Sequence, residues 1–266
     1  MIYDSAFMKR NNDSYKGDFG HVLIIGGDYG MGGAVIMAAE AAYRVGAGKV
    51  TILSREENFV ALLTRLPNAM TTKYDGDLAK NLTGKTVIVI GCGLGKSEWA
   101  TSLVAQALAS NSPKIIDADA LNIISESDKK IDLHNSIITP HVGEAARLLG
   151  ISPSQIQQDR QKSAQNLQQK FNAITVLKGS GSLVVGKEIY QCHYGNPGMA
   201  TAGMGDILSG IIGGLVAQNL DLEKAARFGV TIHAQAGDLV AKHQGQIGMM
   251  PQDLFSYLPR LVNGLE

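Results

Sequence analysis

The sequence predicts an α/β fold in three layers, with a central, mostly parallel sheet between two layers of helices. Three features indicate this fold. Short runs of β-branched and other apolar residues alternate with segments of helical periodicity along the whole chain. Within most runs the apolar residues are consecutive, which is typical of strands that are covered on both faces. A glycine-containing turn follows most of the runs, as in successive βαβ units.

Six of these runs are predicted to form strands, at residues 21–25, 49–53, 86–90, 114–116, 136–138 and 174–177. Helical periodicity predicts helices at residues 33–45, 56–66, 98–109, 143–149, 153–171, 206–218 and 222–243. Segment 183–194 instead contains two short apolar runs around a Gly-Lys pair, which predicts a small antiparallel hairpin at one edge of the sheet. No linker-like or repetitive segment divides the chain, so we expect residues 1–266 to form a single domain.

Composition narrows the classes of function. The 266 residues are 45% hydrophobic, enough for one substantial core, and 24 basic residues balance 24 acidic ones. Without an excess of positive charge, we expect no binding to nucleic acid. The N-terminus lacks an apolar signal segment and no long apolar run occurs, which favours a cytoplasmic location without membrane contact. Cys92 and Cys192 lack the spacing of a metal or redox pair, and a disulfide between them is left as an alternative.

Glycine-rich and polar turns are expected at one edge of the sheet. Each of these turns follows a predicted strand: GGDYGMGGA (26–34), GCGLG (91–95), DADALN (117–122), TPHVGE (139–144) and KGSGS (178–182). In open parallel sheets, ligands bind beyond the carboxyl ends of the strands. Glycine lets backbone N–H groups approach an anion without a β-carbon in the way, so these turns predict a phosphate-binding edge. The alternative for any one glycine turn is that its geometry alone requires glycine.

The segment TAGMGD (201–206) leads directly into the apolar helix that is predicted to begin at Asp206. Free N–H groups at Gly203, Met204 and Gly205, together with the helix dipole, would stabilise negative charge on a phosphoryl group in transfer. The Asp206 carboxylate would accept a proton from a substrate hydroxyl. The alternative is that Asp206 only caps the helix. We therefore predict Asp206, Gly203 and Gly205 as the catalytic residues.

A GxGD turn before a long apolar helix, preceded by a strand and KGSGS, resembles the ribokinase-like family of ATP-dependent small-molecule kinases. The opening segment 16–52, GCGLG, DADALN, TPHVGE, KGSGS and the stretch from TAGMGD to HAQAGD together look like the ADP- or ATP-dependent NAD(P)H-hydrate dehydratases. These motifs follow the family's order over nearly the whole chain. The resemblance implies a ribokinase-like three-layer fold.

The resemblance also implies an activity, which is the repair of NADH or NADPH whose nicotinamide ring has gained water. The ring hydroxyl of the S-epimer would be phosphorylated by ADP, or by ATP, with Mg²⁺ as cofactor. Elimination of phosphate would then restore NAD(P)H and, with ADP, leave AMP. A homotetramer, and a separate epimerase acting in trans on the other epimer, are implied as well. The alternative is a ribokinase-like kinase of a vitamin precursor of the hydroxyethylthiazole or hydroxymethylpyrimidine type.

The resemblance assigns site residues by position. Asp206 matches the family's base and substrate contact, and Gly205 a nucleotide-phosphate contact. Positions that match contacts to the hydrated dinucleotide are Ala34, Gly93 and His141, with Gly95 as a close alternative to Gly93. Positions that match the lining of the adenine nucleotide site are Lys178, Gly179, Ser180, Gly181 and Ser182. Glu144 takes the place of a glutamate that holds magnesium through water in related kinases, and its alternative role is that of an acidic residue favoured at a helix N-terminus.

Some roles stay open because the sequence departs from the family or does not decide. Asp117 and Asp119 could contact a solvent-bridged metal or substrate, or cap the following turn. Lys178 could supply its charge to phosphates or only its backbone. Ala202 and Met204 replace a glycine and a small polar residue of the family's TGGSGD. We therefore expect a negative φ at Ala202 and phosphate contacts from the backbone alone.

Two further alternatives remain for the function. A catalytically silent nucleotide-binding protein on the same fold is disfavoured because Asp206 is retained. A Rossmann-type dehydrogenase is disfavoured because GGDYGMGG lacks the GxGxxG register and no acidic ribose partner follows at the expected spacing.

Overall fold

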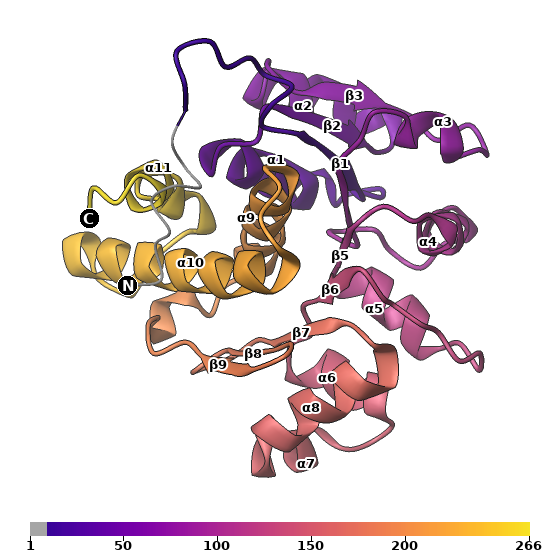
Figure 1. Ribbon diagram of the computed structural model, residues 1–266, viewed down its shortest axis with the longest axis vertical. Helices are drawn as coiled ribbons and strands as arrows, with labels where there is room; N and C mark the ends of the chain where they lie inside the picture. The colour runs from indigo at the N-terminus through magenta and orange to yellow at the C-terminus, as the bar shows by residue number, and fades with distance from the viewer. Residues whose placement is uncertain (1–9) are drawn as a thin grey trace.

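The computed structural model describes residues 10–266, in which nine strands form one sheet in the order β3-β2-β1-β4-β5-β6-β7-β8-β9. The strands are β1 (His21–Ile25), β2 (Lys49–Leu53), β3 (Met70–Thr72), β4 (Val87–Ile90), β5 (Lys114–Ile116), β6 (Ser136–Ile138), β7 (Ile174–Leu177), β8 (Leu183–Val185) and β9 (Ile189–Gln191). Pairing is parallel from β3 to β7 and antiparallel for β8 and β9. The predicted parallel sheet with an antiparallel edge hairpin is confirmed (Figure 1).

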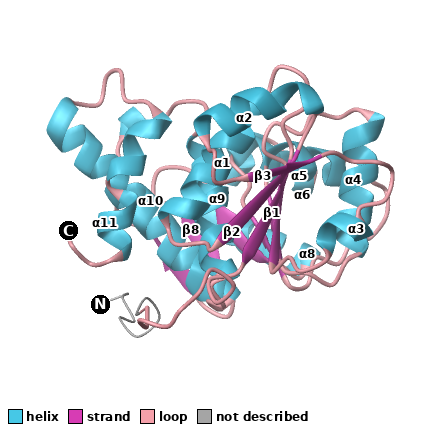
Figure 2. Cartoon of the chain, turned by 90° about the horizontal axis from the view of Figure 1, so that it is seen from above, coloured by secondary structure: helices cyan, strands magenta, loops and turns pink. Residues whose placement is uncertain are grey.

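Helices cover both faces of the sheet, as Figures 1 and 2 show. The helices are α1 (Gly32–Arg44), α2 (Phe59–Arg65), α3 (Ala79–Leu82), α4 (Glu98–Ala109), α5 (Ala118–Ser125), α6 (Val142–Leu149), α7 (Pro153–Gln158), α8 (Arg160–Phe171), α9 (Met204–Ala217), α10 (Leu222–Gln244) and α11 (Leu258–Val262). Val22 and Ile24 of β1 pack with α1, α9 and α10, whereas Leu23 and Ile25 pack with α4, α5, α6 and α8. The two cores confirm the three-layer arrangement.

Four differences from the predicted elements have local causes. The helix predicted at 153–171 is two helices, because Asp159 adopts φ −146° and ψ 84° and its side chain accepts a hydrogen bond from Lys162 N, which starts α8 anew. The segment 56–66 begins as a short 3₁₀ turn (Glu56–Asn58) before α2. Further 3₁₀ turns, Pro197–Met199 and Pro251–Ser256, and the short α3, α5 and α11 were not predicted. β3 was not predicted either, and its residue Met70 is exposed at the sheet edge.

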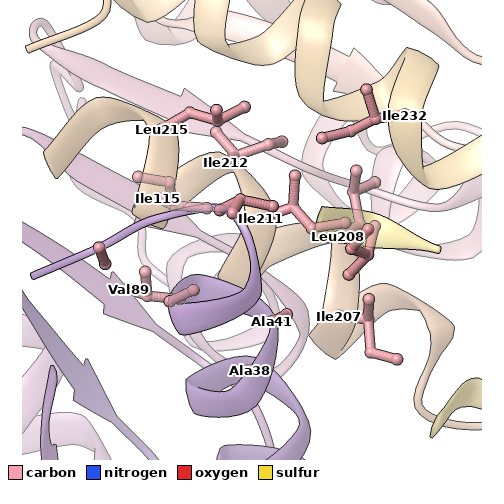
Figure 3. Packing of buried hydrophobic residues seen from close by; sticks show 14 of the residues in the cluster. Ala38, Ala41, Val89, Ile115, Ile207, Leu208, Ile211, Ile212, Leu215 and Ile232 are labelled. Atoms are coloured by element: carbon pink, nitrogen blue, oxygen red, sulfur yellow. The ribbon is translucent and has the colours of Figure 1, made fainter. Parts of the chain in front are cut away.

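Helix α9 is buried over nearly its whole length between α1 and the sheet. Figure 3 shows its residues Ile207, Ile211 and Leu215 among the surrounding apolar side chains. A β-carbon on Gly210 would lie 2.1 Å from the carbonyl oxygen of Ala38 in α1, so only glycine allows the two helices to approach this closely. The close packing fixes the position of the first turn of α9.

The turns after β1 and β4 meet at the point where the strand order reverses, because β1 lies between β2 and β4. Gly27 N donates to the carbonyl oxygen of Cys92 at 3.0 Å, and Asp28 N donates to that of Gly93 at 2.7 Å. Such a reversal opens a crevice beyond the carboxyl ends of the strands, where ligands bind in open α/β sheets.

Two expectations from composition can be compared with residues 10–266. No helix among them is both long enough and apolar enough to cross a lipid bilayer. The prediction that the N-terminus lacks a signal segment falls partly on residues 1–9, which lie outside the described residues. Cys92 and Cys192 are both free and buried, so the alternative of a disulfide between them is wrong.

Candidate active site

The first turn of α9 offers free backbone donors at the carboxyl edge of the sheet. The helix begins at Met204, two residues before the predicted start, so Asp206 occupies its third position and Gly203 is the N-cap with a φ of 100°. Asp206 therefore does not cap the helix, and that alternative is wrong. Within residues 10–266 the N–H groups of Gly205 and Asp206 donate to no other group. Unpaired N–H groups and the helix dipole together favour an anion at this place.

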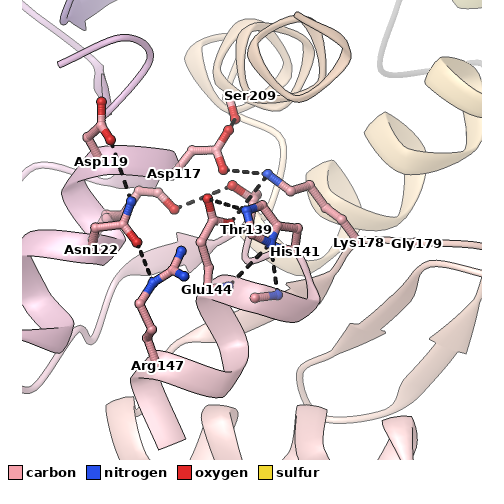
Figure 4. A network of polar contacts seen from close by, with 12 residues as sticks. Asp117, Asp119, Asn122, Thr139, His141, Glu144, Arg147, Lys178, Gly179 and Ser209 are labelled. Atoms are coloured by element: carbon pink, nitrogen blue, oxygen red, sulfur yellow. Dashed lines mark hydrogen bonds and ion pairs between the residues drawn. The ribbon is translucent and has the colours of Figure 1, made fainter. Parts of the chain in front are cut away.

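A buried ion pair lies against this turn. Lys178 Nζ is 2.7 Å from Asp117 Oδ1, and Ser209 Oγ donates to Asp117 Oδ2 at 2.8 Å (Figure 4). A β-carbon on Gly205 would be 3.2 Å from Lys178 Nζ, so the ammonium lies beside the free N–H groups. Burial lowers the pKa of Lys178, but the carboxylates of Asp117 and Glu144 outweigh that effect and raise it, which keeps the ammonium charged.

The structure shows what Asp117 and Asp119 contact, and whether Lys178 contributes its charge, which the sequence left open. Asp117 makes no capping hydrogen bond to α5 and instead holds Lys178 and Ser209. Asp119 Oδ2 accepts a hydrogen bond from Gly95 N at 2.8 Å, which ties the GCGLG turn to α5. Lys178 therefore brings its charge, and not only its backbone, to the edge of the sheet.

Asp206 is a half-buried carboxyl group with a strongly perturbed ionisation. Burial, and then the negative charge of Asp117, raise the pKa of Asp206 to about 6, while a hydrogen bond from the thiol of Cys92 opposes the rise. A carboxyl group with a pKa near the working pH suits general base catalysis, because it is mostly ionised yet basic enough to take a proton.

His141 and Glu144 cap α6 reciprocally. His141 Nδ1 accepts from Gly143 N at 2.9 Å and Glu144 N at 3.2 Å, and Glu144 Oε2 accepts from His141 N at 2.7 Å. The Glu144 side chain is 5% exposed, its Oε2 is 3.8 Å from Lys178 Nζ, and burial raises its pKa to about 7. The His141 ring is 53% exposed and borders this polar network (Figure 4). Both residues thus lie next to Lys178 at the carboxyl edge.

A cavity of about 470 Å³ opens beside the first turn of α9. The whole KGSGS turn, Lys178, Gly179, Ser180, Gly181 and Ser182, lines it together with Gly205. Residues of α9 and α10 form another part of the wall: Met204, Leu208, Val230, His233 and Ala234. The structure therefore brings all the residues predicted to bind the adenine nucleotide onto one cavity.

Three of the residues predicted to contact the dinucleotide, Ala34, Gly93 and Gly95, lie where the turns after β1 and β4 meet, whereas His141 lies at the start of α6. A β-carbon on Gly93 would lie 3.0 Å from the Ala34 β-carbon, and one on Gly95 would lie 2.9 Å from Asp28 Oδ2. Cys92 belongs to the same turn as these two glycines. Its thiol hydrogen-bonds Asp206 of α9. The crevice and the base are thus linked by a direct contact, and the roles of Ala34, Gly93 and Gly95 stay predictions.

The departures in TAGMGD fit the expected geometry. Ala202 is not among the residues with positive φ, so its methyl group causes no backbone strain. The Met204 side chain is 5% exposed and belongs to the core. The side chains at these two positions therefore offer no polar group to a phosphate, and the Met204 N–H, which was predicted to be free, donates to Thr201 O at 3.5 Å.

Sequence reasoning missed several members of this site. The ion-pair role of Asp117, the Ser209 hydroxyl, the Cys92 thiol bond and the cavity wall of α10 were not predicted. The position of Asp117 directly after a strand was a usable signal, because polar residues at strand ends gather at one edge. Ser209 lies within an apolar helix, and only its spacing of three residues from Asp206 hinted at a shared face.

Residues 10–266 contain no group of three or more His, Cys, Asp or Glu side chains that could hold a metal ion directly. Both oxygens of the Glu144 carboxyl group already contact protein groups. Oε1 contacts His141 Nε2, and Oε2 contacts His141 N and Lys178 Nζ. Glu144 therefore fits magnesium only through water, with the ion carried mainly by nucleotide phosphates.

Comparison with known proteins gives consistent matches. The family model described as NAD(P)H-hydrate dehydratase matches residues 22–260. A bifunctional NAD(P)H-hydrate repair enzyme of Coxiella burnetii is 52% identical over 259 residues, which cover 96% of this chain and 53% of that protein. An ADP-dependent (S)-NAD(P)H-hydrate dehydratase of Neisseria meningitidis is 39% identical over 254 residues, covering 92% and 85%. This chain spans about half the length of the bifunctional relatives it matches.

Solved structures agree with the sequence matches. The ADP/ATP-dependent NAD(P)H-hydrate dehydratase of Bacillus subtilis, co-crystallised with ATP and Mg²⁺, superposes with a TM-score of 0.88 at 27% identity, covering 97% of this chain and 94% of that one. Arabidopsis thaliana ribokinase, complexed with ribose and ATP, superposes with a TM-score of 0.57 at 12% identity, covering 90% and 98%. The second match concerns the fold alone and confirms that it is ribokinase-like.

Proposed function

Because the chain belongs to the NAD(P)H-hydrate dehydratase family, we propose that it dehydrates the S-epimer of hydrated NADH or NADPH at the expense of ADP. The observation that carries the proposal is the arrangement at the first turn of α9. Free N–H groups, the Lys178 ammonium and the Asp206 carboxyl group converge there, beside a cavity lined by the KGSGS turn. A reaction that transfers a phosphoryl group to a hydroxyl needs such an anion site and base side by side.

The first step is phosphoryl transfer. The ring hydroxyl at C6 of the hydrate attacks the terminal phosphorus of ADP, the bond from that phosphorus to the bridging oxygen breaks, and AMP leaves. Asp206 takes the hydroxyl proton, and a pKa of about 6 keeps most of its carboxyl groups ionised at neutral pH. The N–H groups of Gly205 and Asp206, together with Lys178, stabilise the negative charge on the phosphoryl oxygens in the transition state of transfer.

The second step is elimination. Phosphate leaves C6 with its bonding electrons, the proton on C5 passes to the departing phosphate or to water, and the C5–C6 double bond of the reduced nicotinamide is restored. Phosphate is a far better leaving group than hydroxide, which explains why a kinase-like site serves a dehydration. No side chain is needed as an acid in this step.

Binding is divided between two places in this proposal. The dinucleotide contacts Ala34, Gly93, Gly95 and His141 in the crevice at the reversal of strand order, and ADP occupies the cavity at the KGSGS turn. The hydrogen bond between the Cys92 thiol and Asp206 supports this division, because Cys92 belongs to the turn that carries Gly93 and Gly95.

Further parts of the proposal concern cofactor and assembly. Glu144 would hold magnesium through water, and the ion would neutralise part of the charge of the nucleotide phosphates. The chain acts as one domain, as its single sheet supports, in a homotetramer in the cytoplasm. An epimerase activity supplies the S-epimer, in line with the bifunctional names of the relatives.

The test is incubation of the protein with NADPH hydrate and ADP, followed at the absorbance of the reduced nicotinamide ring and by chromatography of AMP. Recovery of NADPH with one AMP and one phosphate for each turn is expected. ATP in place of ADP shows which donor is preferred. Phosphorylation of a thiazole or pyrimidine alcohol without NADPH recovery would replace this proposal with the vitamin-precursor kinase.

A further inference from the structure

His233, on helix α10, is a buried polar side chain on the wall of the nucleotide cavity that the proposed reaction leaves without a role. The residue lines the cavity although it is only 9% exposed. Its Nε2 atom is closed off from solvent and has no hydrogen-bond partner in the part of the chain that the structure describes. An unpaired buried polar atom costs free energy, and natural proteins keep one mainly where a ligand or water completes it.

The other ring nitrogen has a partner that fixes the tautomer. The ring hydrogen-bonds the backbone of Met204, and this bond favours the protonated ring, so the backbone group is the carbonyl oxygen, an acceptor. Because Nε2 is unpaired, the donor is Nδ1–H. Burial, and to a smaller extent the charge of Lys178, lower the pKa of His233 to about 4, so the ring is neutral and Nε2 presents a lone pair.

The position of His233 along the cavity indicates which part of a nucleotide it meets. The cavity lining combines the KGSGS turn and Gly205, which suit phosphates, with apolar residues such as Leu208 and Val230, which suit a base. His233 touches the first turn of α9 through Met204 and shares its helix face with Val230. With neighbours in both groups, His233 is placed to meet the ribose of an adenine nucleotide, which connects phosphate to base.

We propose that His233 is a nucleotide-binding residue whose Nε2 accepts a hydrogen bond from a ribose hydroxyl, while its Nδ1–H holds the first turn of α9 through Met204. The proposal rests on the proposed function, because it takes an adenine nucleotide as the occupant of the cavity. Small side-chain adjustments of the kind common on binding bring the hydroxyl to Nε2. The ring thereby couples ribose recognition to the placement of Gly205 and Asp206.

The test separates the two ring nitrogens. In His233→Asn the amide nitrogen replaces Nδ1 and the acceptor is lost, whereas in His233→Gln the amide oxygen replaces Nε2. Affinity for ADP, 2′-deoxy-ADP and 3′-deoxy-ADP is measured by calorimetry without any dinucleotide. His243→Asn is the matched control, since His243 lies on the same helix, exposed, and bonds Leu239 O and Tyr257.

We expect ADP to bind about tenfold more weakly to His233→Asn and nearly normally to His233→Gln and to the control, as for one lost hydrogen bond. One deoxy analogue binds the unsubstituted protein about tenfold more weakly than ADP, and this difference disappears in His233→Asn. Unchanged ADP affinity in a folded His233→Asn, or a deoxy difference that persists in it, would overturn the role of His233 alone. If His233→Asn does not fold, equal affinity of the unsubstituted protein for all three nucleotides overturns it. Failure of the unsubstituted protein to bind ADP or ATP would overturn the proposed function as well.

Discussion

Replacement of Asp206 by asparagine tests the central assignment, because it changes activity and stability in opposite directions. The amide has almost the size of the carboxyl group but can neither accept a proton nor carry charge. Its neighbours are a thiol, from Cys92, and the negative charge of Asp117. The substitution therefore removes the base while leaving the packing of α9 intact.

The loss of activity follows from general base catalysis, which contributes about 10²- to 10⁴-fold to a rate. We expect kcat/KM of Asp206→Asn to fall by that factor. In the unsubstituted protein, a pKa of about 6 makes kcat/KM rise with pH and level off above it. At pH 5 only about a tenth of the carboxyl groups are ionised, so the rate should be about tenfold below the plateau. The variant's residual rate should lack this rise.

The gain in stability follows from the same pKa. In the folded protein it is raised from 3.8 to about 6, so folding favours the protonated carboxyl group. That stabilisation is complete below the unfolded value near 4 and is lost as pH rises through about 6. At pH 8 the ionised group opposes folding by at most about 3 kcal/mol, from about 1.4 kcal/mol per pKa unit. Asparagine removes this cost, so the variant should be more stable at pH 8 and about equal at pH 4.

Three measurements check the reasoning. Steady-state rates of NADPH recovery between pH 5 and 8 give the activity, and urea unfolding at pH 4 and pH 8 gives the free energy of unfolding of both proteins. Binding of ADP, measured separately, should be retained. A variant that turns over at the rate of the unsubstituted protein, or that is less stable at pH 8, would refute the role of Asp206 as a base whose negative charge destabilises the folded protein.

Three other predictions concern the residues around it. Lys178→Met leaves the Asp117 carboxylate buried without its cation and should lower the free energy of unfolding by about 3–5 kcal/mol, most of which Lys178→Met with Asp117→Asn should restore in urea titrations. Gly203→Ala forces alanine into a φ of 100° and places a β-carbon 2.6 Å from a methionine sulfur, so thermal melting should show a loss of about 1–3 kcal/mol. Glu144→Gln should raise the magnesium concentration for half-maximal activity about tenfold, and an unchanged magnesium titration would remove Glu144 from the metal site.

The sheet was largely predictable from the sequence, because the local pattern of residues predicts most of its strands. Strands β1 and β2 have the predicted limits, since each is a short run rich in β-branched and apolar residues that begins directly after a glycine. β3 was missed because a three-residue edge strand with exposed Met70 carries no apolar pattern. The break of the helix at Asp159 was missed because helical periodicity continues across it, and only the tertiary structure sets its dihedral angles.

The candidate site was predictable in position but not in its contacts. Glycine turns at strand ends indicated the edge and the place of Asp206, because parallel strands bring their carboxyl ends together. The bond between Lys178 and Asp117 joins residues 61 positions apart, and that between Ser209 and Asp117 joins residues 92 apart. Residue periodicity describes which face of an element is buried and holds no information on such distant partners.

The close contact between Gly210 and Ala38 has a consequence for motion. A helix whose backbone touches its neighbour cannot slide along its axis without a steric clash, because packed interiors shift between discrete arrangements and do not deform freely. Conformational adjustment during a catalytic cycle should therefore be confined to loops such as 178–182 and 194–200. In hydrogen-exchange experiments the amides of α9 beyond its first turn should exchange among the slowest in the protein, while those loops respond to bound ADP.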